Sequence, residues 1–121
     1  MALSYRIDSG IVTIVGDYAE PDEWRTLLNT IAADPDYRPG FCFLRDLRES
    51  IHPVSAQSVI GIIAVVREFW HTLGVRRAAI VTGFIPADPA LIAHALAEDE
   101  HIPLRAFRTY SDAVAWLSES D

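Results

Sequence analysis

The stretch from Phe41 to Leu73 constrains the fold more than any other part of the chain. It begins with a short apolar segment, Phe41–Asp46, and continues through a loop into a long apolar segment, Val54–Leu73. A strand that is apolar on both faces is typical of the centre of a parallel sheet covered on both sides. The stretch therefore predicts a central strand, a loop and a long helix of an α/β protein.

The predicted helix Val54–Leu73 is more apolar than a helix packed only on a sheet needs to be. At about 100° per residue its apolar arc covers roughly two-thirds of the circumference, whereas a stripe of little more than ~100° suffices for one-sided packing. Gly61 and Ala64, on the remaining face, would allow another backbone to approach closely. We expect the apolar residues outside this stripe to contact neighbouring helices, a second subunit or an apolar ligand. Ile60 and Val65 extend the main apolar face to either side. The main face consists of Val59, Ile62, Ile63, Val66, Phe69, Trp70 and Leu73.

Further strands and helices alternate on either side of this stretch. Leu3–Asp8 alternates apolar and polar residues, and the turn residues Asp8-Ser9-Gly10 connect it to Ile11–Val15, which predicts a hairpin. The later strands are predicted at Phe41–Asp46, Ala78–Val81 and Leu104–Arg108, and the helices open near Pro21, Val54, Asp88 and Ser111. This order predicts a five-stranded mixed sheet, an N-terminal antiparallel hairpin followed by parallel strands, with four helices.

Size and charge restrict the class of protein and its partners. The 121 residues predict a single domain, 1–121, that can bury a core without a disulfide or a metal. A net charge of −7 argues against nucleic acid as a partner. The longest uncharged apolar run, Pro53–Val66, is too short for a transmembrane span of about 20 residues. The single cysteine, Cys42, and an N-terminus without a signal-peptide pattern predict a cytoplasmic protein with a core thiol.

Asp46, His52 and Ser55 follow the central strand, where α/β proteins place functional groups. They could act as orienter, base and nucleophile, but no nucleophile elbow or glycine-rich oxyanion loop accompanies Ser55. The alternative is that Asp46 pairs with Arg45 or Arg48, that His52 is a loop residue and that Ser55 caps the long helix. We therefore predict no catalytic residue.

Two other groups of residues could bind ligands. His94 and Glu98 are spaced i, i+4 with His101 just beyond, which could assemble metal ligands but is not a His-Glu-x-x-His motif. Five arginines at strand ends could converge on an anion, although Arg76 and Arg77 belong to the opposite sheet edge from Arg48. We predict neither a metal nor a cofactor. The five arginines are Arg45, Arg48, Arg76, Arg77 and Arg108.

Three segments together resemble one family: Phe43-Leu44-Arg45-Asp46-Leu47-Arg48, Arg77–Val81 and Ala106–Leu117. The first is a hydrophobic strand ending in Asp-x-Arg, and the last follows a "vFrs-x-x-eA-x-x-WL" pattern. The chain is similar to the SpoIIAA-like (STAS-like) small bacterial domains. The resemblance implies a superhelix of β-α units with helices mainly on one face, an architecture related to the lipid-binding CRAL-TRIO domains.

The resemblance does not extend to the phosphorylation switch of the wider group. Anti-sigma-factor antagonists carry Asp-Ser-Ser-Gly or Asp-Ser-Thr-Gly before the second helix. Here Val54, Ala56 and Gln57 replace the Asp, the phosphoacceptor and the Gly, and Ser55 keeps a capping role. The sequence thus implies no phosphoacceptor serine.

The leading hypothesis is a non-enzymatic STAS-like module that acts through protein–protein contact, with a homodimer as a candidate assembly. The alternatives are a carrier of an apolar or lipid-like molecule, held between the long helix and Leu91–Leu96, and a small hydrolase or metal-dependent enzyme. The candidate partner or ligand surface comprises Asp46, Arg48, His52, Ser55, Gly61, Ala64, Val65 and Trp70.

Overall fold

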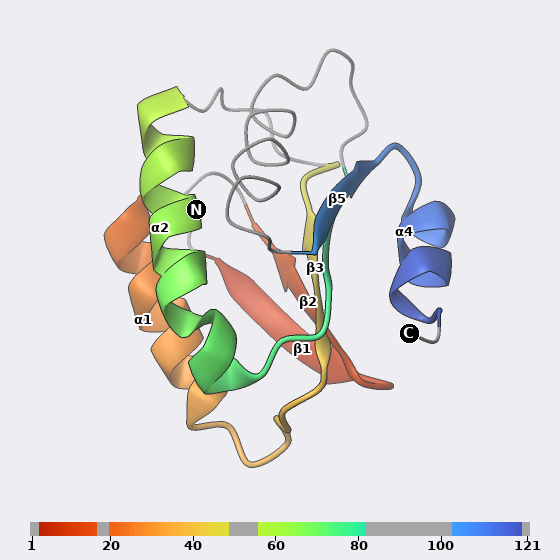
Figure 1. The fold of residues 1–121 in the computed structure, drawn as a ribbon, viewed down its shortest axis with the longest axis horizontal. Coiled ribbons are helices and arrows are strands. Elements are labelled where there is room, and N and C mark those ends of the chain that lie inside the picture. Colours follow the sequence, from red (N-terminus) through yellow and green to blue (C-terminus); the bar gives the residue numbers. More distant parts are fainter. Residues whose placement is uncertain (1–2, 17–19, 49–55, 82–102, 120–121) are drawn as a thin grey trace.

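The computed structural model describes residues 3–16, 20–48, 56–81 and 103–119 (Figure 1). These residues contain five strands and three helices. In chain order they are β1 (Ser4–Asp8), β2 (Ile11–Val15), α1 (Pro21–Ala32), β3 (Cys42–Asp46), α2 (Ala56–Leu73), β4 (Ala78–Val81), β5 (Leu104–Phe107) and α4 (Tyr110–Leu117). The prediction of four helices is met only in part, because three are described and the helix predicted from Asp88 to Glu98 lies outside the described residues.

The five strands form one mixed sheet in the order β1-β2-β3-β4-β5. β1 and β2 are antiparallel, and each later strand is parallel to the one before it, as the sequence predicts. Ser9 and Gly10 form the two-residue hairpin loop, and both have positive φ, 53° and 78°. This is the geometry of a type I′ turn, whose twist matches that of the strands it joins.

Helices cover both faces of the sheet, with α1 and α2 on one side and α4 on the other (Figure 1). The core is therefore divided into two clusters. Trp24, Leu27, Leu28 and Ile31 of α1 pack with α2 and with Val12 and Ile14 of β2. On the opposite face, Cys42 and Leu44 of β3 and Ala79 and Val81 of β4 pack beneath Ala113 and Leu117 of α4. Two of the three described helices thus share a face.

The ends of α1 and α4 show how local sequence starts a helix. Pro21 occupies the first turn of α1, where its missing N–H costs nothing, and the Glu20 N–H donates to the Glu23 carboxylate at 3.4 Å. In α4 the cap is Thr109, whose hydroxyl accepts a bond from the Asp112 N–H at 3.2 Å. The helix predicted to open near Ser111 begins one residue earlier, at Tyr110, because Thr109 rather than Ser111 caps it.

Two arginines attach the end of α4 to the sheet. Arg76 donates to the carbonyl oxygens of Leu117 and Glu119, and Arg77 donates to that of Trp116. The Arg77 guanidinium also lies 5.1 Å from the centre of the Trp116 ring. Because the last carbonyls of a helix lack intrahelical partners and carry partial negative charge, these cations stabilise the C-terminal end of α4.

Candidate functional site

Asp46 and Arg48 form a closed ion pair at the carboxyl edge of the sheet. Asp46 ends β3, and Arg48 donates to it from Nε to Oδ1 at 2.9 Å and from Nη2 to Oδ2 at 2.7 Å. The Arg48 backbone N–H donates to the same Oδ1 at 3.1 Å. These bonds hold the pKa of the Asp46 carboxyl below its usual range. Of the two arginines predicted as partners, Arg48 makes the ion pair.

Arg45 joins the end of β3 to the end of β2. Its guanidinium donates to the carbonyl oxygens of Ile14 at 3.3 Å, Gly16 at 3.2 Å and Asp46 at 3.4 Å. It also lies 5.5 Å from the centre of the Trp24 ring. Such a guanidinium satisfies backbone acceptors where β2 ends, which is a structural role.

The five arginines do not converge on one site, because they lie at opposite ends of the parallel strands. Arg48 lies past the end of β3, with its guanidinium 5.2 Å from the centre of the Tyr110 ring. Arg76 and Arg77 lie before the start of the parallel strand β4 and hold the end of α4. An anion therefore cannot touch both groups at once, as the sequence analysis noted for these two arginines.

The candidate residues on α2 fall into an inner and an outer group. Val65 is 4% exposed and belongs to the core, and Trp70 packs against that core. A Cβ on Gly61 would lie 2.8 Å from Pro21 Cγ, so the close approach that Gly61 permits is to α1 of the same chain. Ala64 is exposed on the outer side. It lies one turn after Ile60, which is 53% exposed.

Several predicted groups lie outside the described residues. They are His52, Ser55, the metal-ligand candidates His94, Glu98 and His101, and the carrier segment Leu91–Leu96. Within the described ranges, no three side chains of His, Cys, Asp or Glu cluster so as to hold a metal ion. None of the helices in those ranges has both the length and the apolar character of a membrane span.

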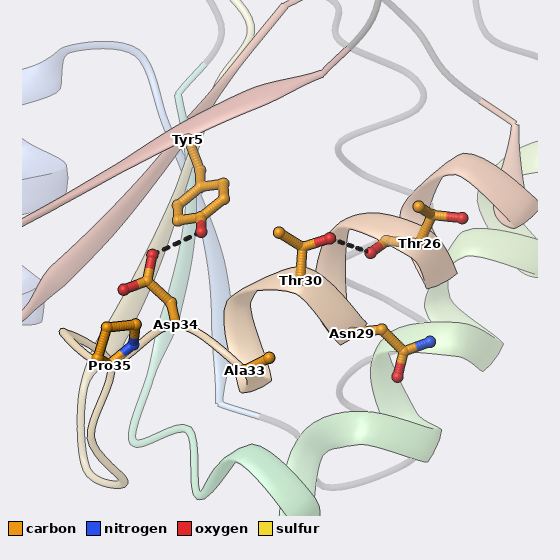
Figure 2. Close-up of a pocket in the computed structure, with 7 residues that line it drawn as sticks. All are labelled: Tyr5, Thr26, Asn29, Thr30, Ala33, Asp34 and Pro35. Atoms are coloured by element: carbon orange, nitrogen blue, oxygen red, sulfur yellow. Dashed lines mark hydrogen bonds between the residues drawn. The ribbon is translucent and has the colours of Figure 1, made fainter.

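An open hollow lies between β1 and the end of α1, a site that the sequence analysis did not identify. It is lined by Tyr5, Thr26, Asn29, Thr30, Ala33, Asp34 and Pro35 (Figure 2). Tyr5 reaches from β1 and donates to Asp34 Oδ2 at 2.6 Å. This bond raises the pKa of the Tyr5 phenol and lowers the pKa of the Asp34 carboxyl. The two residues are 29 positions apart, and no local pattern links them.

Comparison with known proteins identifies the fold. No protein-family model matches the chain, and no curated protein matches it. The structure resembles the crystal structure of an uncharacterized protein of the DUF3478 family, with a SpoIIAA-like fold, from Shewanella loihica PV-4. The two chains are 16% identical, the match covers 96% of this chain and 92% of the other, and the TM-score is 0.60. A likeness at this identity speaks for the fold alone, and this chain accordingly has a SpoIIAA-like fold.

Proposed function

We propose that this domain is a non-enzymatic STAS-like module that acts by binding another protein through the outer surface of α2. The observation that carries the proposal is the exposure of Ile60. This residue is 53% exposed, and among the described residues it is the large hydrophobic side chain that lies in solvent. Ala64, one turn later, is also exposed and is small enough to let a partner approach the helix. Together they form a short apolar stripe suited to a partner's apolar groove.

The state of Asp46 supports a role other than catalysis. A general base works best when its pKa lies near the operating pH and when it can reach a substrate proton. The carboxyl of Asp46 instead has a lowered pKa, and Arg48 occupies both of its oxygens. As a proton acceptor at neutral pH it is therefore weak. The Asp46–Arg48 pair instead contributes to the stability of the fold.

Crosslinking followed by reconstitution tests the proposed contact surface. A photoreactive amino acid at position 60 identifies the partner in an extract of the source cells, and the purified partner is then titrated calorimetrically. We expect Ile60→Asp and Ala64→Asp to weaken binding roughly tenfold or more, equivalent to about 1.4 kcal/mol. Ala115→Asp is the matched control, because Ala115 is exposed on α4 across the sheet. Equal affinity of all three variants would exclude the α2 surface.

A native mass spectrum of the purified protein addresses the alternative function of carrier. The interaction module predicts the mass of the protein chain alone, as a monomer or an oligomer. A reproducible additional small-molecule mass would contradict the module and support carriage of an apolar ligand. The same sample, folded and unfolded before injection, shows whether the additional mass is bound non-covalently.

A further inference from the structure

β1 is an edge strand whose backbone can accept another strand. It stands at the end of the sheet order and, within the described ranges, pairs with β2 (Figure 1). The type I′ turn closes between Asp8 and Ile11, so Asp8 directs its backbone groups toward β2. These directions alternate along an antiparallel strand. The N–H and C=O groups of Tyr5 and Ile7 consequently point away from β2, where a further strand would bind.

The side chains of β1 differ between its two faces. Tyr5 and Ile7 are partly buried against the core beneath α1 and α2. Arg6 and Asp8 are exposed on the opposite face, two positions apart and of opposite charge. Charged residues on an edge strand commonly prevent pairing between copies. A strand that carries one charge of each sign, however, can complement itself when it is reversed.

We propose that two copies of this chain associate through antiparallel pairing of their β1 strands, centred on Ile7. In this register Ile7 faces the partner's Ile7, and their outward N–H and C=O groups bond reciprocally. Arg6 then lies opposite the partner's Asp8, and Asp8 lies opposite the partner's Arg6. These are non-hydrogen-bonded positions of the ladder, where side chains are closest. The two sheets become one continuous sheet.

Charge selects this register over its neighbours. The outward backbone groups also meet when the pairing centres on Arg6 or on Asp8. The first places two arginines directly opposite each other, and the second places two aspartates opposite each other. Like charges at facing positions destabilise a strand pair. The register centred on Ile7 matches both charges. It also places the partly buried Ile7 side chains of the two copies opposite each other on the helix side, with Tyr5 diagonal to the partner's Ile7.

Charge exchange between Arg6 and Asp8 tests the proposal. Sedimentation velocity of the full-length chain should show a dimer, and Arg6→Asp or Asp8→Arg alone should shift it to monomer. An equimolar mixture of the two single variants should recover a dimer, because each charge then faces its opposite. The double variant Arg6→Asp/Asp8→Arg should dimerise with itself. A monomeric natural chain, or single variants that dimerise unchanged, would overturn the proposal.

Amide hydrogen exchange provides a second measurement that needs no variant. In a monomer the outward amides of Tyr5 and Ile7 exchange rapidly, while those of Arg6 and Asp8 are protected by β2. Dimerisation through β1 should slow exchange at Ile7 at least tenfold as concentration rises, without changing Arg6. Exchange at Ile7 that is independent of concentration and fast would refute the interface. The Ile60→Asp variant should still dimerise, which separates this proposal from the proposed α2 surface.

Discussion

The ring of Pro21 occupies the space that a side chain on Gly61 would need. A Cβ atom on Gly61 would stand 2.8 Å from Pro21 Cγ, closer than such atoms approach in proteins. Further along the same two helices, Arg25 of α1 forms an ion pair with Glu68 of α2 at 2.6 Å. Glycine at position 61 therefore sets how closely the first turn of α1 lies against α2, and it does so within one chain.

Gly61→Ala should destabilise the protein despite the better helix propensity of alanine. The clash with the proline ring costs about 1–3 kcal/mol, and alanine returns about 1 kcal/mol in a helix interior. We expect a net loss near ~1 kcal/mol in urea unfolding. In the Pro21→Ala background, which removes the ring, the same change should stabilise. A loss of equal size in both backgrounds would show that the contact is not responsible.

Asp46 should make stability depend on acid pH. Its pKa is lowered in the folded state by the bonds from Arg48, so its contribution is present above the unfolded value of about 3.9. That contribution is lost as pH falls through the lower, folded value. Asp46→Asn should be less stable than the natural chain at neutral pH, and the difference should shrink below about pH 4. Urea unfolding at several pH values measures it, with the exposed Asp36→Asn as control.

Tyr37 should produce the opposite dependence at alkaline pH. Its hydroxyl donates to the Leu73 carbonyl at 2.6 Å, and burial raises its pKa to about 12. Because the folded value exceeds the unfolded value of about 10, this stabilisation is complete below about pH 10 and is lost as pH rises toward 12. Tyr37→Phe should lower stability by about 1 kcal/mol at neutral pH. The difference from the natural chain should fall above pH ~10. A constant difference would contradict the assignment.

Arg76 and Arg77 should control access to Cys42. The thiol is 3% exposed beneath α4, and its sulfur lies 3.6 Å from the Leu117 carbonyl oxygen. Replacing both arginines with alanine removes the donors that hold the end of α4. We expect the rate of thiol labelling under native conditions to rise about tenfold, because α4 opens more often. Cys42 is the single cysteine, so the signal is unambiguous. Arg105→Ala, which removes the other cation over the Trp116 ring, is the control.

The periodicity of the sequence was sufficient to predict where the strands lie, but it predicted only partly which residues of α2 are buried. The hairpin, the central strand and the parallel strands that follow it are at the predicted positions. On α2, however, Val65 was assigned to the margin of the apolar face, whereas it is 4% exposed. It lies on the side of the helix that carries Gly61, where α1 packs. Periodicity reports the hydrophobicity of a face but not which neighbour covers it.

Strand alternation, turn residues and the right-handed crossover rule were enough to predict the order of the described elements and the mixed sheet. The SpoIIAA-like fold was expected from the resemblance of three segments to that family, and the structural comparison supports it. The tertiary structure alone decided that Pro21 meets Gly61, that Tyr5 bonds to Asp34 and that Arg76 and Arg77 hold the end of α4. Each of these contacts joins residues that are at least 29 positions apart. Such contacts depend on the distances and angles at which whole elements pack, and no short sequence pattern encodes those.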